Sequence, residues 1–191
     1  MDPHAGEDWQ EYLRSLEVFG MRPGLERVVA LLDLLDHPER SFRSIHVVGT
    51  NGKSSTTRYA ASVLQAHGLH AAAYLSPHIA GFHERLLIDG RPVAADAFGA
   101  AVGKVRRASA TLATELDPVT QFEALTVAAL LAAAECGVEA AARNAATVRA
   151  SNCVTGPTSA GRPGLSTRTR SIAAPNNDAE TGRPSTSSRS W

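Results

Sequence analysis

Residues 44–55 read Ser-Ile-His-Val-Val-Gly-Thr-Asn-Gly-Lys-Ser-Ser. The first five are short, largely β-branched and followed by Gly49, which predicts a buried strand over residues 44–48. A helix is expected over residues 53–67, ending at Gly68. Its apolar side is expected to consist of Ala60, Ala61, Val63 and Leu64. The order strand, glycine-rich turn, helix is the setting that a phosphate-binding loop requires.

The turn itself has the residues that bind phosphate. Glycines let the backbone fold tightly and turn several N–H groups toward an anion. The helix N-terminus adds a partial positive charge, and Lys53 adds a full charge for the β- and γ-phosphates of a nucleotide. A hydroxyl at Ser54 or Ser55 is placed to reach Mg²⁺ or a phosphate oxygen. The candidate ATP-binding residues are Gly49, Thr50, Asn51, Gly52, Lys53, Ser54 and Ser55.

This loop is shorter than the common Walker pattern. Val47 stands where that pattern has its first glycine. The alternative interpretation is therefore a glycine-rich turn with a solvated lysine.

The rest of the first 142 residues alternates between helical and strand patterns. We expect helices over residues 7–16, 23–36, 94–116 and 120–136, further strands over residues 70–75 and 138–142, and a hairpin over residues 85–93. The hairpin turn is Asp89-Gly90. The alternation predicts an α/β fold, with a P-loop-type parallel sheet and flanking helices.

Composition excludes several classes of protein. The formal net charge is zero, which gives no support for binding to nucleic acid or to an anionic membrane surface. The two cysteines are too few for a disulfide framework. The N-terminus lacks the pattern of a secretory signal, and the longest apolar run, residues 124–136, is shorter than a bilayer span. We expect a soluble, cytoplasmic monomer with no nucleic-acid or membrane partner.

The composition changes at residue 143. Residues 143–191 are rich in Ser, Thr and Arg, contain no Lys and have few large apolar side chains. Such a segment buries too little apolar surface to offset its ordering entropy, so we predict a low-complexity, disordered tail. The segment is interpreted either as a natural basic tail or as a sequence translated out of frame after Ala142. The frame-disrupted interpretation is the favoured hypothesis, and the coding DNA tests it.

Several stretches in the first 142 residues resemble the folylpolyglutamate/dihydrofolate synthases of the Mur ligase family. The stretch Ile45–Ser55 resembles their first signature. Further resemblance lies in residues 19–27 (Phe-Gly-Met-Arg-Pro-Gly-Leu-Glu-Arg), 74–78 (Tyr-Leu-Ser-Pro-His), 84–90 (Glu-Arg-Leu-Leu-Ile-Asp-Gly) and 120–123 (Thr-Gln-Phe-Glu). The resemblance covers about residues 10–142. It implies that residues 1–142 form an N-terminal helical segment and an incomplete Mur ligase-type ATPase domain.

The resemblance also implies an activity. Members of this family are ATP-dependent ligases that join glutamate to a folate or dihydropteroate carboxylate through an acyl phosphate, with ATP and Mg²⁺. Lys53 would be the catalytic residue, and Ser76 and Ser55 would be the metal ligands. His78 and Arg85 are candidates for substrate binding, whereas Phe122 and Glu123 are expected to be structural.

Part of the family pattern is absent after Ala142. The family continues there with a Val-Glu-x-Gly segment, whose glutamate binds Mg²⁺, and later with a glutamate-binding domain. We therefore expect a truncated or frame-disrupted member without ligase activity of its own. The alternatives are a non-catalytic nucleotide-binding remnant and a Mur ligase of cell-wall synthesis; the Ser-Pro-His and Thr-Gln-Phe-Glu stretches disfavour the cell-wall enzyme.

Overall fold

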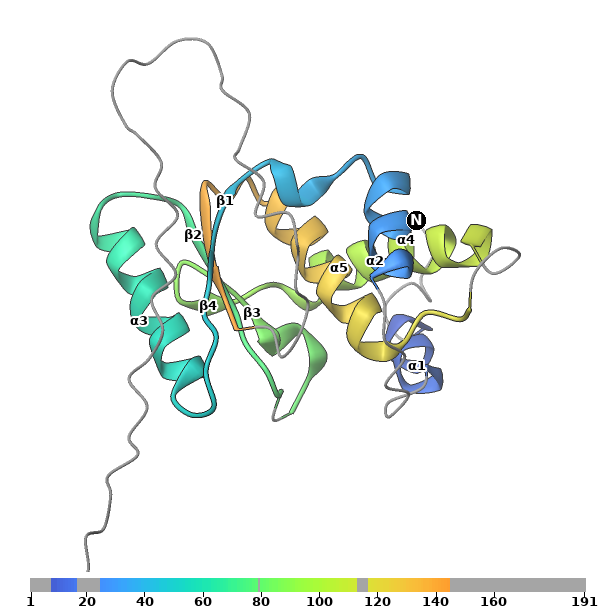
Figure 1. Ribbon diagram of the computed structural model, residues 1–191, viewed down its shortest axis with the longest axis horizontal. Coiled ribbons are helices and arrows are strands. Elements are labelled where there is room, and N and C mark those ends of the chain that lie inside the picture. Colours follow the sequence, from blue (N-terminus) through green and yellow to red (C-terminus); the bar gives the residue numbers. More distant parts are fainter. Residues whose placement is uncertain (1–7, 17–24, 79, 113–116, 145–191) are drawn as a thin grey trace, which may run out of the picture.

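The computed structural model of this 191-residue chain describes residues 8–16, 25–78, 80–112 and 117–144. They form five α-helices, two short 3₁₀ helices and a five-stranded sheet (Figure 1). The helices are α1 (Asp8–Ser15), α2 (Glu26–Leu34), η1 (Pro38–Arg40), α3 (Lys53–Ala66), η2 (Phe82–Arg85), α4 (Ala95–Leu112) and α5 (Gln121–Glu135). The strands are β1 (Arg43–His46), β2 (Ala71–Tyr74), β3 (Leu86–Ile88), β4 (Arg91–Pro92) and β5 (Ala140–Arg143).

The sheet is mixed rather than purely parallel. Its order is β1-β5-β2-β3-β4. β5 pairs in parallel with both β1 and β2, whereas β3 is antiparallel to β2 and β4 is antiparallel to β3. The predicted hairpin is confirmed, with Asp89 and Gly90 both at positive φ in the turn. The three parallel strands end at the same edge of the sheet, so the segments that follow β1, β2 and β5 lie close together.

Helices cover the sheet unequally. Of the described α-helices, α3 alone lies on one face, and α5 packs against the other face with α1, α2 and α4 around it (Figure 1). Beneath α3 there is a small core of Ala61, Ala73, Leu75, Leu87 and Ala142. The larger core surrounds α5, which is apolar over most of its circumference and is therefore buried on several sides.

α5 is fixed at its start by a capping box. The Thr120 hydroxyl accepts a hydrogen bond from the main-chain N–H of Glu123, and the Glu123 carboxylate accepts one from the main-chain N–H of Thr120. The same carboxylate accepts hydrogen bonds from both Nε and Nη2 of Arg27 in α2, with Nη2 2.8 Å from Oε1. Both side chains are buried, so the pair joins α2 to α5. The structural role predicted for Glu123 agrees with these contacts.

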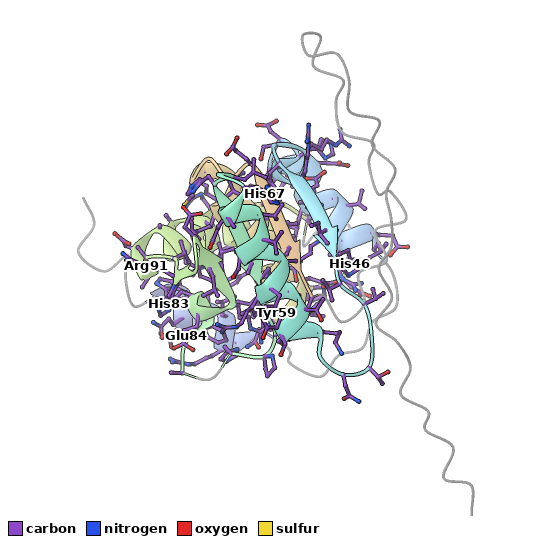
Figure 2. The ribbon with its side chains drawn as sticks, turned by 90° about the vertical axis from the view of Figure 1, so that its left-hand side faces the viewer. His46, Tyr59, His67, His83, Glu84 and Arg91 are labelled. Atoms are coloured by element: carbon purple, nitrogen blue, oxygen red, sulfur yellow. The ribbon has the colours of Figure 1, made fainter. Side chains whose placement is uncertain are left out.

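Three expectations need correction. β1 was predicted to be buried, but its side chains are largely exposed, and 41% of Ile45 remains accessible. The reason is its position at the end of the sheet, where β5 is its only pairing partner among the described strands. Val63 was placed on the apolar side of α3, but it is 56% exposed, and Thr57 and Ala61 are the buried residues of that helix. Figure 2 shows the outward face of α3, with Tyr59 labelled on it and His46 labelled on the neighbouring β1.

The third correction concerns the end of β5. The tail was expected to start at residue 143, but Arg143 completes β5 and Asn144 after it is buried. Residues 145–191 of the predicted tail lie outside the described residues, as do residues 17–24 and 113–116. None of the described helices has both the length and the hydrophobicity needed to cross a membrane.

Candidate functional site

The phosphate-loop candidate connects the end of β1 to the start of α3. Its main-chain path leaves the sheet after Val47, whose N–H donates to the carbonyl of Arg143 in β5 (2.8 Å). Gly52 is the N-cap of α3 and has φ +72°, a conformation that residues with a Cβ rarely adopt. A Cβ there would meet nothing within 4 Å, so it is the backbone angle that requires glycine. The sequence thus predicted both the turn and the helix start.

Lys53 is the first residue of α3 and its side chain folds over the loop. Its ammonium group donates hydrogen bonds to the carbonyls of Gly49 (2.8 Å) and Thr50 (2.9 Å). The positive charge is thereby held beside the loop amides and the helix N-terminus. All three features favour an anion at this position.

Ser54 connects the loop to the ends of two other strands. Its hydroxyl donates to the main-chain oxygen of Ser76, just after β2 (3.3 Å), and accepts from the side-chain Nδ2 of Asn144, just after β5 (2.8 Å). Thr50, Asn51 and the second hydroxyl, Ser55, are exposed. Of the two predicted metal ligands, Ser76 is therefore bonded to Ser54, whereas the hydroxyl of Ser55 makes no hydrogen bond to Ser76 among the described residues.

Asn144 was missed because the change in composition placed it in the tail. A usable signal was present, since Asn144 follows the alanine-rich strand whose end must lie at the same edge as the phosphate loop. Asn144 is 2% exposed, and its main-chain N–H donates to the carbonyl of Tyr74 (3.1 Å).

The candidate substrate residues, His78 and Arg85, contact each other in the segment between β2 and β3. The Nε of Arg85 donates to Nδ1 of His78 (3.0 Å), and the imidazole ring packs against Phe82, with 4.7 Å between ring centroids. Burial lowers the pKa of His78 below its ordinary value, and the charge of Arg85 lowers it further. His78 is therefore held neutral, as an acceptor for a buried guanidinium. The Ser76-Pro77 peptide bond that precedes it is cis.

The oxygen atoms around Ser54 fit Mg²⁺ only in part. Mg²⁺ takes oxygen ligands and usually keeps several water molecules. The described residues contain no group of three or more His, Cys, Asp and Glu side chains that could hold a metal ion. The amide oxygen Oδ1 of Asn144 is buried and accepts no hydrogen bond from the described residues. Ser54, Ser76 and Asn144 thus offer neutral oxygens, which suit a magnesium ion that arrives with a nucleotide.

Comparison with known proteins gives a consistent picture. No family model matches the chain. Dihydrofolate synthase/folylpolyglutamate synthase of Bacillus subtilis is 36% identical over 132 residues, which cover 69% of this chain and 31% of that protein. The Mycobacterium tuberculosis protein of the same name is 33% identical over 127 residues, covering 62% of this chain and 26% of its own length. The chain thus spans about a third or less of the curated relatives it matches.

Solved structures show the same likeness. Folylpolyglutamate synthetase from Lactobacillus casei has a TM-score of 0.69 at 33% identity, covering 78% of this chain and 37% of that chain. Mycobacterium tuberculosis folylpolyglutamate synthase complexed with ADP has a TM-score of 0.67 at 29% identity, covering 74% of this chain and 32% of that one. In sequence and in fold, this chain belongs to the folylpolyglutamate/dihydrofolate synthase family.

Proposed function

We propose that this chain provides the nucleotide-binding part of an ATP-dependent ligase that adds glutamate to a folate or dihydropteroate carboxylate. The observation that supports this most directly is the geometry of the loop from Gly49 to Lys53. The ammonium group of Lys53 lies beside the loop, and the hydroxyl of Ser54, the next residue, donates a hydrogen bond to the main-chain oxygen of Ser76, just after β2. Among similar solved structures, one is a complex of folylpolyglutamate synthase with ADP and another a complex with AMPPCP and folate.

The proposed reaction has two steps. The substrate carboxylate attacks the γ-phosphorus of ATP, giving an acyl phosphate and ADP. The amine of glutamate then attacks the acyl carbon, phosphate leaves, and an amide forms. Such chemistry asks the protein mainly to position the phosphates and to neutralise their charge. Bound Mg²⁺ would add further neutralisation of the phosphate oxygens.

Different residues of the chain would have different roles in this reaction. The amides of the loop and the first turn of α3 bind phosphate oxygens, and Lys53 exchanges its bonds to Gly49 and Thr50 for bonds to phosphate. Ser54 and Ser76 would offer oxygen ligands to a nucleotide-bound cation. His78 and Arg85 follow Ser76 in the chain and are proposed to face the folate or dihydropteroate substrate.

The test is nucleotide binding by the purified 191-residue chain. We expect ADP to bind and Lys53→Ala to weaken binding by about 10- to 100-fold, because a charge-assisted hydrogen bond contributes roughly 1.5–3 kcal/mol. Isothermal titration calorimetry measures both dissociation constants.

Lys104→Ala is the matched control for charge. Lys104 is an exposed lysine of α4 paired with Glu135, away from the loop. Equal losses of ADP affinity in the two variants would show that only overall charge matters. Undiminished binding by Lys53→Ala would contradict the role given to the loop.

A further inference from the structure

The exposed apolar side chains of the described residues gather at one end of the sheet. Six large apolar side chains are exposed, and four of them belong to α3, to β1 and to the segment just after β1: Ile45, Val48, Tyr59 and Val63. Figure 2 looks onto this face, with Tyr59 labelled on α3 and β1 beside the helix. Clustered apolar side chains on a protein surface are typical of an interaction site.

The registers of the strands explain why Ile45 is exposed. Ile45 lies opposite Ala142 of β5, and Ala142 lies opposite Ala73 of β2. Residues opposite each other on paired strands point to the same face of the sheet. α3 covers Ala142 and Ala73, which are almost fully buried, but 41% of Ile45 remains accessible. The helix layer on this face therefore ends before the sheet does.

Val63 and Tyr59 border the uncovered part of the sheet from the helix side. A Cβ at Gly90 of the β3–β4 hairpin would lie 3.9 Å from the side chain of Gln65, so Gln65 is on the hairpin side of α3. Successive helix residues are rotated by about 100°, which places Val63 on the opposite side, toward β1. Tyr59 lies one turn before Val63 on that side. Ile45, Tyr59 and Val63 together form an apolar strip.

β1 borders this apolar strip with the outer edge of its main chain. The main-chain N–H groups of Arg43 and Val47 donate to the carbonyls of Glu139 (3.1 Å) and Arg143 (2.8 Å) on the β5 side. The main-chain groups of Ser44, the residue after Arg43, therefore point away from β5. No described strand pairs with β1 on that side. β1 also lacks proline and lysine, which commonly protect a strand edge from association.

We propose that this edge and the apolar strip bind a second copy of the chain, with the two β1 strands antiparallel about a two-fold axis perpendicular to the sheet. A strand edge is self-complementary in such a pair, because each copy offers the same row of N–H and C=O groups. The Ile45 side chains of both copies meet between the two α3 helices. The two Arg43 residues lie at opposite ends of the pair, and the zero net charge adds no overall repulsion.

The C-terminal segment of the same chain fits this surface less well. A strand that covers an apolar strip needs apolar residues at alternate positions. In residues 145–191 the Val, Leu, Ile and Trp residues are six or more positions apart. A second β1 segment meets the requirement, because Ile45 and Val47 are two positions apart. A dimer therefore replaces the monomer that was expected from the sequence.

The oligomeric state of the full 191-residue chain tests the proposal. Sedimentation velocity over a series of concentrations should show the 20.1-kDa chain passing into a species of twice that mass. Hydrogen exchange of the Ser44 amide should slow by about tenfold or more as the dimer forms, because this N–H gains a partner.

Two variants act on different parts of the surface. Ser44→Pro removes an N–H that β5 does not use, and Val63→Lys places a charge on the apolar strip. Each should raise the dissociation constant of the dimer by about tenfold or more. Val29→Lys is the matched control, because Val29 is a half-exposed valine of α2, on the other face of the sheet, and the constant should not change. Circular dichroism reports whether Ser44→Pro folds, and Val63→Lys decides the matter if it does not.

The proposal is overturned if the chain keeps the mass of a monomer at every concentration. A dimer that neither Ser44→Pro nor Val63→Lys weakens, or that Val29→Lys weakens equally, would also overturn it, because another surface would then be in contact. Larger open-ended assemblies, or a stable complex with a different protein in place of the dimer, would contradict the second copy as occupant. Nucleotide binding is measured separately by calorimetry, so neither proposal depends on the other.

Discussion

At the scale of single residues, His78 shows how burial sets the protonation of a site residue. Burial is the main cause that lowers its pKa below the ordinary 6.5, and the charge of Arg85 is the next. Nδ1 accepts a hydrogen bond from Arg85, which a protonated ring could not do. The unprotonated form of His78 is thus part of the folded structure.

This arrangement predicts a pH dependence of stability. The pKa of His78 is lower in the folded protein than in the unfolded chain. As the pH falls past the ordinary value of 6.5, the unfolded chain therefore binds more protons than the folded protein does. The free energy of unfolding should therefore decrease as the pH falls through that value. His78→Asn keeps an acceptor for Arg85 and removes the titration, so its decrease should be smaller. Urea unfolding at a series of pH values measures the free energy of unfolding. An equal dependence on pH in the unmodified chain and in His78→Asn would contradict the prediction. His67→Asn, which removes an exposed histidine, provides the comparison.

Among the phosphate-loop residues, Gly52 and Lys53 owe their roles to the local sequence. The backbone angle of Gly52 and the contacts of Lys53 follow from residues within four positions in the chain. The partners of Ser54, by contrast, come from residues 76 and 144. Sequence spacing alone left the choice between Ser54 and Ser55 open for this reason, and the family resemblance favoured Ser55 as the metal ligand.

At the scale of elements, the contact between α1 and α4 depends on a glycine. Trp9 of α1 lies over Gly99 and meets the ring of Phe98 edge to face, with 5.9 Å between centroids. A Cβ added at Gly99 would lie 2.6 Å from two atoms of the Trp9 ring, which no real contact tolerates. The absence of a side chain at Gly99 thus allows α1 to pack closely on α4.

Two glycine substitutions in α4 should therefore have opposite effects. Gly99→Ala should destabilise the fold by about 1–3 kcal/mol through overpacking against Trp9. Gly103→Ala, one turn further along, would meet only Nη1 of Arg107 at 3.8 Å and should stabilise the helix by about 0.5–1 kcal/mol. Urea unfolding of each variant measures its change in the free energy of unfolding and shows whether the substitution destabilises or stabilises the fold. A gain in stability for Gly99→Ala would show that Trp9 moves aside at no cost.

Most elements followed from sequence pattern. Helices α3 and α5 were predicted within a few residues because Gly68 and Gly137 end them, both at positive φ. The prediction that β1 is buried was wrong because a β-branched run fits a buried strand and an edge strand equally well. Pairing within the sheet, which is non-local, decides between the two.

At the scale of the whole molecule, the matched region is about a third or less of each curated relative. We propose that this region provides the phosphate loop and that ligation also requires groups from the remainder of the relatives' length. The 191-residue chain by itself is then expected to bind ADP but to form no glutamate adduct. Incubation with ATP, Mg²⁺, labelled glutamate and dihydropteroate or tetrahydrofolate tests this.

The Bacillus subtilis relative is the positive control for that assay. Labelled product formed by the 191-residue chain in repeated preparations would overturn the expectation. Failure of ADP binding together with failure of ligation would instead favour a chain that has lost the site altogether.

The sequence by itself determined the glycine-rich loop before α3, the helix ends, the hairpin turn and the family, because each depends on residues that are neighbours in the chain. Only the tertiary structure decided that Asn144 is bonded to Ser54, that β1 is an edge strand and that Glu123 is paired with Arg27. These three features join segments far apart in sequence, and the pairing of strands and packing of helices brings them together. Composition placed Asn144 in a tail, whereas the parallel register of β5 between β1 and β2 places it beside the loop.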